Sequence, residues 1–266
     1  MKIRVREERV LVISDLHLGN PFSLAAMRMH DFLDYVREGG WSLIINGDGL
    51  EILQASFTAM AAHSLDVAQQ LTKLQRAGCN VYYVVGNHDI TLEHLLHTWL
   101  GEHICPFLNV WSGEARIRVE HGHLYDPFFV NYPRLYSLAT MAAAPLLHVS
   151  PDVYRVWSGY QRMKESAREW AFPNRPGHGS AFTEAAEMLT GRGFDAVVFG
   201  HTHKPEVVRL QGGGLYINSG NWMRGTTFVE IDHGRVALRR WHRGEVLTLQ
   251  GGAPQLLVDG SRGDRG

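Results

Sequence analysis

The sequence has little cysteine, almost no net charge and no long apolar run. Its 266 residues include only two cysteines, Cys79 and Cys105, which excludes a disulfide-bonded scaffold and a cysteine-rich zinc fold. The 26 basic and 27 acidic residues leave a net charge of −1, whereas a dedicated nucleic-acid-binding protein is usually strongly basic. We therefore do not expect nucleic acid as a partner.

No segment of the sequence is long and apolar enough to predict a membrane span. The longest weakly polar stretch, residues 138–149, contains Pro145 and His148 and falls short of the roughly 20 apolar residues that a transmembrane helix needs. Residues 1–10 lack the apolar run of a signal peptide. The expected location is cytoplasmic, and peripheral contact with a membrane surface stays open.

Short apolar runs and helical spacing alternate along most of the chain. Buried strands are predicted at residues 10–14, 43–46, 81–85 and 196–199, and helices at 24–37, 59–76 and 91–100. This alternation predicts an α/β fold with a mainly parallel sheet that is covered on both faces. From residue 215 onward, shorter runs at 215–218, 227–231 and 236–241 predict an antiparallel portion. We expect one domain over residues 1–250 and a frayed tail over 251–266.

Residues 124–182 interrupt this alternation and are rich in aromatic side chains. They hold 11 of the 27 aromatic residues, with mostly helical spacing that is broken at several prolines. The segment is predicted to be a helical insertion. Two interpretations stay open, since it could pack on its own core or form a cap over the active site.

The sequence is rich in histidine, with 15 residues, and several stand beside acidic or amide side chains after predicted strands. In open α/β sheets the ligand site forms outside the carboxyl ends of the strands, so these polar clusters are expected to converge. The clusters are Asp15 and His17, then Asp48, then Asn87, His88 and Asp89, then His121 and His123, and finally His201 and His203.

Seven of these residues offer imidazole, carboxylate or amide donors and no thiolate: Asp15, His17, Asp48, Asn87, His121, His201 and His203. One metal cannot use seven ligands. Two divalent metals that share Asp48, with a hydroxide between them, would each be five- or six-coordinate. Such mixed nitrogen and oxygen ligation suits Mn, which we expect first, and also Fe, Zn or Ni. Two metals about 3.5–4 Å apart serve in-line displacement at phosphorus.

In this order the clusters resemble the calcineurin-like metallophosphoesterase family. The motifs that carry the resemblance are Ser14-Asp15-Leu16-His17, Asn46-Gly47-Asp48, Gly86-Asn87-His88-Asp89, Glu120-His121-Gly122-His123 and Gly200-His201-Thr202-His203. The resemblance covers residues 9 to 232. It implies a four-layer α/β/β/α sandwich with a dinuclear metal site.

The resemblance also implies a role for each matching residue. One metal would take Asp15, His17, Asp48 and His203, and the other would take Asp48, Asn87, His121 and His201. His88 matches the catalytic histidine of the family, which contacts the phosphoryl oxygens or protonates the leaving group. Asp89 is grouped with it as a residue that orients His88 or a ligand. His123 is either a substrate-contacting group or a structural residue.

Within the family, the closest resemblance is to the UDP-2,3-diacylglucosamine pyrophosphatase group of lipid A synthesis. It rests on residues 14–19, on Glu51 after Asp48, on Asp126 after His121-Gly122, and on residues 200–205 and 216–222. In that group a helical insertion shelters acyl chains, and water cleaves the pyrophosphate to UMP and an acylated sugar phosphate. The group carries Arg where this chain has His88 and Asp where it has His123.

The expected substrate is therefore a small-molecule or lipid-linked phosphoester. Basic residues of the insertion are candidate phosphate contacts, and otherwise belong to a solvated helix face: Arg134, Arg155, Arg162, Lys164 and Arg168. The same metal core could also serve a nuclease, a cyclic-nucleotide phosphodiesterase or a phosphoprotein phosphatase. A non-catalytic scaffold is a further alternative, although such proteins typically lose ligands that this chain retains.

Overall fold

The computed structural model describes residues 3–20, 23–51, 57–89, 103–132 and 178–249. The predicted helix at 91–100, the predicted tail at 251–266 and most of the predicted insertion lie outside them. Among the described residues, no helix combines the length and apolar character that crossing a bilayer requires.

A seven-stranded sheet combines strands from the first and last parts of the described chain. Strands β2, β3, β4 and β5 run parallel to one another. Strands β11, β12 and β13 extend the sheet beyond β2 with antiparallel pairing. In spatial order the strands are β13 (Glu245–Thr248), β12 (Arg235–His242), β11 (Thr227–Asp232), β2 (Arg9–Ile13), β3 (Ser42–Asn46), β4 (Val81–Val84) and β5 (Ile104–Cys105).

A six-stranded sheet of mixed direction packs against the first. β7, β8 and β10 are mutually parallel, and β9 and β6 pair with them in antiparallel fashion. In spatial order the strands are β1 (Arg4–Arg6), β6 (Phe107–Ser112), β7 (Ala115–Glu120), β8 (Ala196–Phe199), β10 (Leu215–Asn218) and β9 (Glu206–Arg209).

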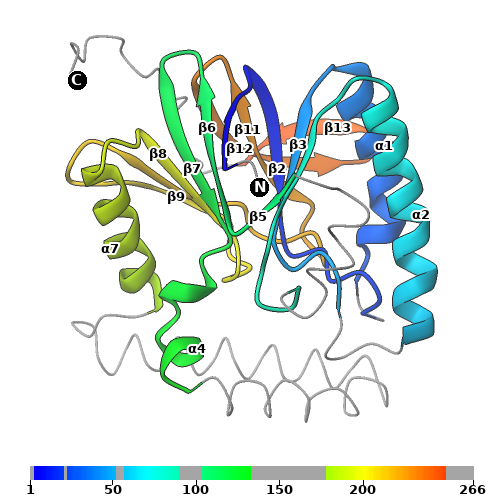
Figure 1. The fold of residues 1–266 in the computed structure, drawn as a ribbon, viewed down its shortest axis with the longest axis horizontal. Helices are drawn as coiled ribbons and strands as arrows, with labels where there is room; N and C mark the ends of the chain where they lie inside the picture. Colours follow the sequence, from blue (N-terminus) through cyan, green and yellow to red (C-terminus); the bar gives the residue numbers. More distant parts are fainter. Residues whose placement is uncertain (1–2, 21–22, 52–56, 90–102, 133–177, 250–266) are drawn as a thin grey trace.

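Helices cover the outer face of each sheet (Figure 1). α1 (Ala25–Glu38) and α2 (Phe57–Arg76) lie on the seven-stranded sheet, and α7 (His178–Gly191) lies on the six-stranded one. α1 buries Ala25, Met29, Phe32, Leu33 and Val36, a spacing of three or four residues that places them on one helix face. Two short elements, η3 (His123–Tyr125) and α4 (Pro127–Asn131), follow β7.

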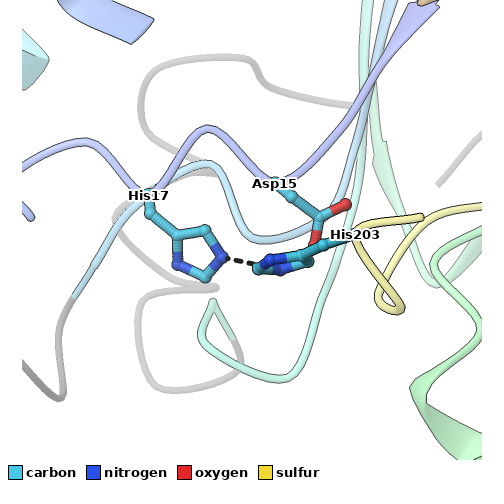
Figure 2. Close-up of side chains that lie close together, drawn as sticks. All are labelled: Asp15, His17 and His203. Atoms are coloured by element: carbon cyan, nitrogen blue, oxygen red, sulfur yellow. Dashed lines mark hydrogen bonds and ion pairs between the residues drawn. The ribbon is translucent and has the colours of Figure 1, made fainter. Parts of the chain in front are cut away.

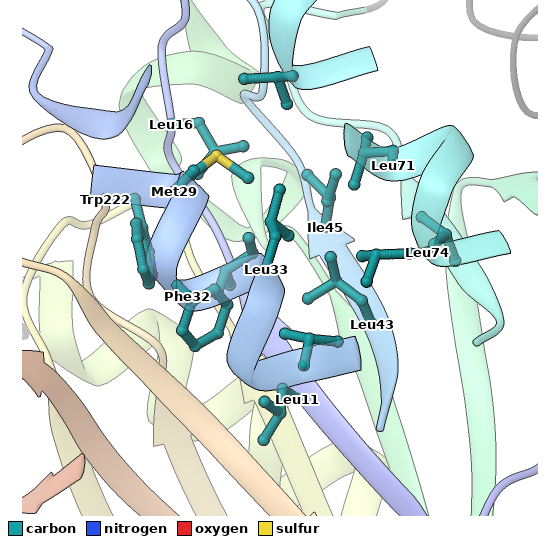
Figure 3. Packing of buried hydrophobic residues seen from close by; sticks show 14 of the residues in the cluster. Leu11, Leu16, Met29, Phe32, Leu33, Leu43, Ile45, Leu71, Leu74 and Trp222 are labelled. Carbon is teal, nitrogen blue, oxygen red and sulfur yellow. The ribbon is translucent and has the colours of Figure 1, made fainter. Parts of the chain in front are cut away.

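Alternation along β2 shows how the layers are built. Val10 and Val12 join the core between the two sheets, whereas Leu11 and Ile13 join the core beneath α1 and α2 (Figure 3). Successive strand residues point to opposite faces, so a continuous apolar run is required where both faces are covered. The predicted four-layer α/β/β/α sandwich is confirmed.

Two details of the predicted topology were wrong. The spacing predicts residues 196–199 in the same parallel sheet as residues 10–14, 43–46 and 81–85, whereas β8 lies in the second sheet, which covers one face of the first. The run at 215–218 was assigned to an antiparallel portion, but β10 pairs in parallel with β8 and antiparallel with β9. Its four residues are all buried, as in a central strand, so their pattern did not reveal the direction of pairing.

We expect Phe32→Ala to destabilise the protein by about 3–5 kcal/mol, because it empties a fully buried aromatic site. The Phe32 ring lies 4.6 Å from that of Trp222 and 5.3 Å from that of Phe228, measured between centroids. Urea unfolding measures the loss. Met27→Ala on the same helix is the control, since Met27 is 77% exposed and should change stability by less than about 0.5 kcal/mol. Equal effects of the two substitutions would contradict this account of the core.

Candidate metal centre

The predicted site residues come together at one rim, to which both sheets contribute. Asp15 and His17 follow β2, Asp48 follows β3, and residues 87–89 follow β4, all in the seven-stranded sheet. His121 follows β7, and His201 and His203 follow β8, in the six-stranded sheet. The rim therefore lies where the carboxyl ends of parallel strands from two sheets meet, and the site spans the interface between them.

The backbone at this rim is left-handed at five of the seven predicted ligands. The φ angles are 55° at Asp15, 45° at His17, 53° at Asp48, 65° at His201 and 60° at His203. Non-glycine residues rarely adopt this region, and each such residue costs about 1–3 kcal/mol. Strain of this kind persists only where the surrounding structure enforces it, and it concentrates at functional sites.

Two glycines give the predicted ligands the room they need. Gly47 has a φ of 80°, and a Cβ there would overlap the imidazole of His121. A Cβ at Gly86 would overlap the carboxylate of Asp48. Both positions exclude any side chain, because the loops approach each other closely at the cluster.

The first group of donors consists of Asp15, His17 and His203 (Figure 2). The two Nε2 atoms of His17 and His203 lie 3.3 Å apart, and His203 Nε2 lies 3.1 Å from Asp15 Oδ1. Glu51 Oε2 accepts from His17 Nδ1 at 2.9 Å, which leaves Nε2 of that ring with its lone pair directed at His203.

The second group consists of Asp48, His121 and His201. His121 Nδ1 donates to the Asn46 carbonyl at 2.8 Å, so in the neutral ring Nε2 carries the lone pair, and it lies 3.3 Å from Asp48 Oδ2. Within the described part of the chain, this buried Nε2 has no hydrogen-bond partner. On the other side, His201 Nδ1 lies 3.1 Å from Asn87 Oδ1.

These contacts fit a divalent cation centre. His121 Nε2 beside Asp48 Oδ2, and the Nε2 atoms of His17 and His203, bring lone pairs within 3.3 Å of one another. A proton or a metal cation between the paired atoms removes the repulsion, and a bound metal would take the place of the proton. The donors are imidazole nitrogens and carboxylate oxygens without sulfur, which suits first-row divalent metals.

His88 belongs to a third group, with His17 and Asp48. Its Nδ1 donates to Glu51 Oε1 at 3.0 Å, and its Nε2 lies 4.0 Å from Asp48 Oδ2. Glu51 is 1% exposed and therefore holds both His17 and His88 through its two oxygens. With Nδ1 held in this way, Nε2 of His88 is directed into the cluster, where it can contact either a substrate oxygen or a cation.

Asp89 is directed at backbone rather than at the cluster. Its fully buried carboxylate accepts from the amide nitrogens of Asp48 at 2.7 Å, Gly86 at 3.0 Å and Leu50 at 3.3 Å. These bonds join the loops that follow β3 and β4. Of the roles considered for Asp89, the geometry favours positioning of the Asp48 loop.

The charges of the cluster shift the pKa values of its members consistently. Burial acts to raise the pKa of Asp48, but His121 and His88 outweigh it and hold that pKa well below its usual range. Burial acts to lower the pKa of His121, yet Asp48 and Asp15 raise it to about 10. Asp48 and Glu51 likewise raise the pKa of His88 to about 9 against the effect of burial. The cluster stabilises positive charge, as a cation site must.

The remaining predicted contacts are placed differently. His123 lies at the edge of the cluster, with ring centroids 5.6 Å from His121 and 5.2 Å from Phe129. Burial, with the nearby His121 and His201, lowers the pKa of His123 to about 3, so this ring is neutral. The basic residues predicted as phosphate contacts lie outside the described residues: Arg134, Arg155, Arg162, Lys164 and Arg168.

Residue types alone did not reveal three residues that organise the site. In the sequence, only the family resemblance points to Glu51 and Asp126, and only the Asn46-Gly47-Asp48 motif points to Asn46. Asn46 joins the two sheets, because its Nδ2 donates to the Glu120 carbonyl at 3.0 Å while its own carbonyl accepts from His121. The available signal for Glu51 was an acidic residue three positions after Asp48, directly after the apolar Leu50.

An apolar cavity of about 300 Å³ lies behind the loops of the cluster. Its lining includes Leu16, Leu18, Leu50, Leu71 and Tyr83. These side chains belong to the core beneath α1 and α2. The cavity is therefore part of helix packing rather than of the cluster.

Comparison with known proteins agrees with this geometry. The sequence profile of the family described as Calcineurin-like phosphoesterase matches residues 8–205. Proteins named UDP-2,3-diacylglucosamine hydrolase are also similar. The one from Stenotrophomonas maltophilia is 26% identical over 239 residues, covering 84% of this chain and 95% of its own. The one from Azotobacter vinelandii is 25% identical over 238 residues, covering 84% and 94%.

Among solved structures, a dimetal phosphatase from Danio rerio has a similar fold. The TM-score is 0.51 at 12% sequence identity, and the match covers 90% of this chain and 98% of that one. At this identity the likeness concerns the fold alone, and it agrees with the two-sheet architecture.

We expect Asp48→Ala to remove bound metal, because Asp48 belongs to two of the three donor groups and its Oδ2 lies 3.3 Å from His121 Nε2. Elemental analysis of protein purified with Mn²⁺ measures the metal bound per chain. Asp34→Ala is the matched control, since Asp34 is an exposed acid on α1 that pairs only with a neighbouring surface Arg37 in the described contacts. Full metal occupancy in Asp48→Ala would refute the assignment of Asp48 as a ligand.

Proposed function

The chain belongs to the calcineurin-like phosphoesterase family and is a metal-dependent phosphoesterase. We propose that it hydrolyses the pyrophosphate bond of an acylated UDP-sugar of the UDP-2,3-diacylglucosamine type. The observation that carries the proposal is the position of Asp48 between two groups of imidazole donors. A carboxylate in that position can serve two cations at once. We therefore propose a dinuclear centre with Mn²⁺ as the first metal to test.

The proposed ligands are Asp15, His17, Asp48 and His203 for one metal, and Asp48, Asn87, His121 and His201 for the other. When bound, divalent cations supply Lewis-acid activation of water and of phosphoryl oxygens. The chain itself orients these ligands, because Glu51 holds His17 and the Asn46 carbonyl holds His121. Hydrogen bonds of this kind fix the ring tautomer and raise the basicity of the ligand nitrogen.

His88 is proposed to act on the substrate. Glu51 fixes Nδ1 of His88, so Nε2 faces the cluster within reach of a phosphoryl or leaving-group oxygen. A protonated Nε2 would donate to that oxygen as negative charge develops on it. Asp89 holds the loops that carry Asp48 and His88 in fixed relative positions, because its carboxylate accepts hydrogen bonds from Asp48 N on one loop and Gly86 N on the other.

The acylated substrate is proposed from two observations. The relatives named UDP-2,3-diacylglucosamine hydrolase match over 84% of this chain. In addition, apolar side chains are exposed directly after the His121–His123 motif, where Leu124 is 63%, Val130 53% and Tyr132 59% exposed. Such a group of exposed apolar side chains beside a polar site is typical of a surface that binds an apolar partner. We propose that this surface faces the acyl chains.

The proposed setting is the cytoplasm, at the surface of a membrane that holds the lipid substrate or product. Both cysteines are buried and free, as in a reducing compartment.

A panel of substrates tests the proposal. With Mn²⁺, we expect release of UMP from UDP-2,3-diacylglucosamine with a kcat/KM at least about 10²-fold above that for unacylated UDP-N-acetylglucosamine, because each buried methylene contributes about 0.8 kcal/mol. Chromatography of the uridine products measures both rates. Asp48→Ala protein, purified identically, controls for contaminating hydrolases. Turnover of cyclic nucleotides without turnover of the acylated substrate would contradict the lipid assignment and leave phosphoester hydrolysis intact.

Substitution of His88 tests its role. We expect His88→Ala to keep its metals and to lower kcat by about 10²–10⁴-fold, the usual contribution of an acid–base group. Metal content and kcat are measured on the same preparation. His242→Ala is the control, because His242 is exposed at the end of β12. Loss of metal from His88→Ala would instead identify His88 as a ligand, as its place in the group with His17 and Asp48 permits.

A further inference from the structure

Asp126 lies between η3 and α4 and uses its two carboxylate oxygens for different purposes. Oδ1 accepts from Phe128 N at 2.8 Å, which caps the start of α4. Oδ2 lies 3.0 Å from His201 Nε2. The residue is 9% exposed, so these bonds are shielded from water. One side chain thus connects a helix end to a predicted metal ligand.

This contact fixes the tautomer of His201. An ionised carboxylate only accepts hydrogen bonds, so Nε2 of His201 must carry the hydrogen. In the neutral ring Nδ1 then carries the lone pair, and it lies 3.1 Å from Asn87 Oδ1, another predicted ligand of the same metal. Without Asp126, the ring could place its hydrogen on Nδ1 and direct a donor at the metal position.

The position of Asp126 in the chain gives the contact a second consequence. Asp126 stands near the start of residues 124–182, the segment predicted as a cap, and α4 carries the exposed Val130 beside the cluster. His201 is held from the other side, because its backbone nitrogen donates to Asp15 Oδ2 at 3.2 Å. A shift of α4 would move Oδ2 away from His201, and a shift of His201 would disturb the cap of α4.

We propose that Asp126 is a positioning residue that orients His201 for metal binding and couples α4 to the occupancy of that metal. The inference rests on the proposed dinuclear centre and adds to it a link between one metal and the segment proposed to face the substrate. Partners that orient metal-bound histidines typically change metal affinity by about 10- to 100-fold when substituted.

Asp126→Asn separates the two contacts of the carboxylate. Asparagine is a good N-cap, so Oδ1 can still accept from Phe128 N and α4 should persist. The other arm becomes an NH2 group, which cannot accept from His201 Nε2. In a Co²⁺ titration followed by visible absorption, we expect one of two binding events to weaken by about 10- to 100-fold. The other event and the melting temperature of the metal-free protein should not change.

The matched control is Asp195→Asn. Asp195 precedes the same strand, β8, that His201 follows, and its carboxylate also accepts a backbone hydrogen bond, from Arg116 N at 2.9 Å. It should bind both Co²⁺ ions as the unmodified protein does. If Asp126→Asn lowers the metal-free melting temperature, Asp126→Ser replaces it, because serine also caps helices but is too short to reach His201. Two events of unchanged affinity in the substituted protein would overturn the proposal.

Hydrogen exchange tests the coupling separately from activity. In the unmodified protein, Co²⁺ binding should slow amide exchange in residues 123–132, and in Asp126→Asn this slowing should be lost while residues 115–120 of β7 keep their protection. Equal slowing in both proteins would overturn the coupling. An unmodified protein that binds fewer than two Co²⁺ ions would instead refute the proposed dinuclear centre, so the two failures are distinguishable.

Discussion

The burial of negative charge at the rim between the two sheets is the constraint on which the site depends. Asp15, Asp48 and Asp89 are each at most 2% exposed, and every one is surrounded by donors or imidazoles. An uncompensated buried carboxylate would be very costly, so the neighbours must be placed closely around it. The two glycines, the left-handed loops and the backbone bonds to Asp89 all serve that placement. They give the cluster a fixed shape.

That fixed shape requires a rigid support, and the layers provide it. Five left-handed residues at about 1–3 kcal/mol each store a strain that would be comparable with the whole stability of a small domain. The loops are therefore held from several sides. Asp15 N donates to the Gly47 carbonyl at 3.1 Å, and Met223 N donates to the Asp15 carbonyl at 3.0 Å. Beneath them, two sheets with fully buried apolar strands resist the relaxation that would release the strain.

The sequence was informative about the chemistry of the rim and less so about its architecture. Asp15, Asp48 and His201 could be recognised because five polar clusters follow predicted strands in one order, although each cluster alone is typical of a turn. The strands predicted at 10–14, 43–46, 81–85 and 196–199 lie within one residue of the observed ends. The division into two sheets could not be read from periodicity, since β7 and β8 pair across more than 75 residues. The roles of Glu51 and Asp126 could not be predicted from periodicity for the same reason, because their partners His17, His88 and His201 are near them only in the folded chain.

The two carboxylates that orient histidines differ in what they connect. Glu51 joins His17 to His88, so it ties one proposed metal to the proposed catalytic ring within the rigid rim. Asp126 joins His201 to α4, so it ties the other proposed metal to the apolar surface after residue 123. Because the first link lies wholly within the sandwich and the second leaves it, only the second metal would respond to movement of α4. The position of α4, which carries part of the apolar surface, and the occupancy of the second proposed metal would therefore be coupled.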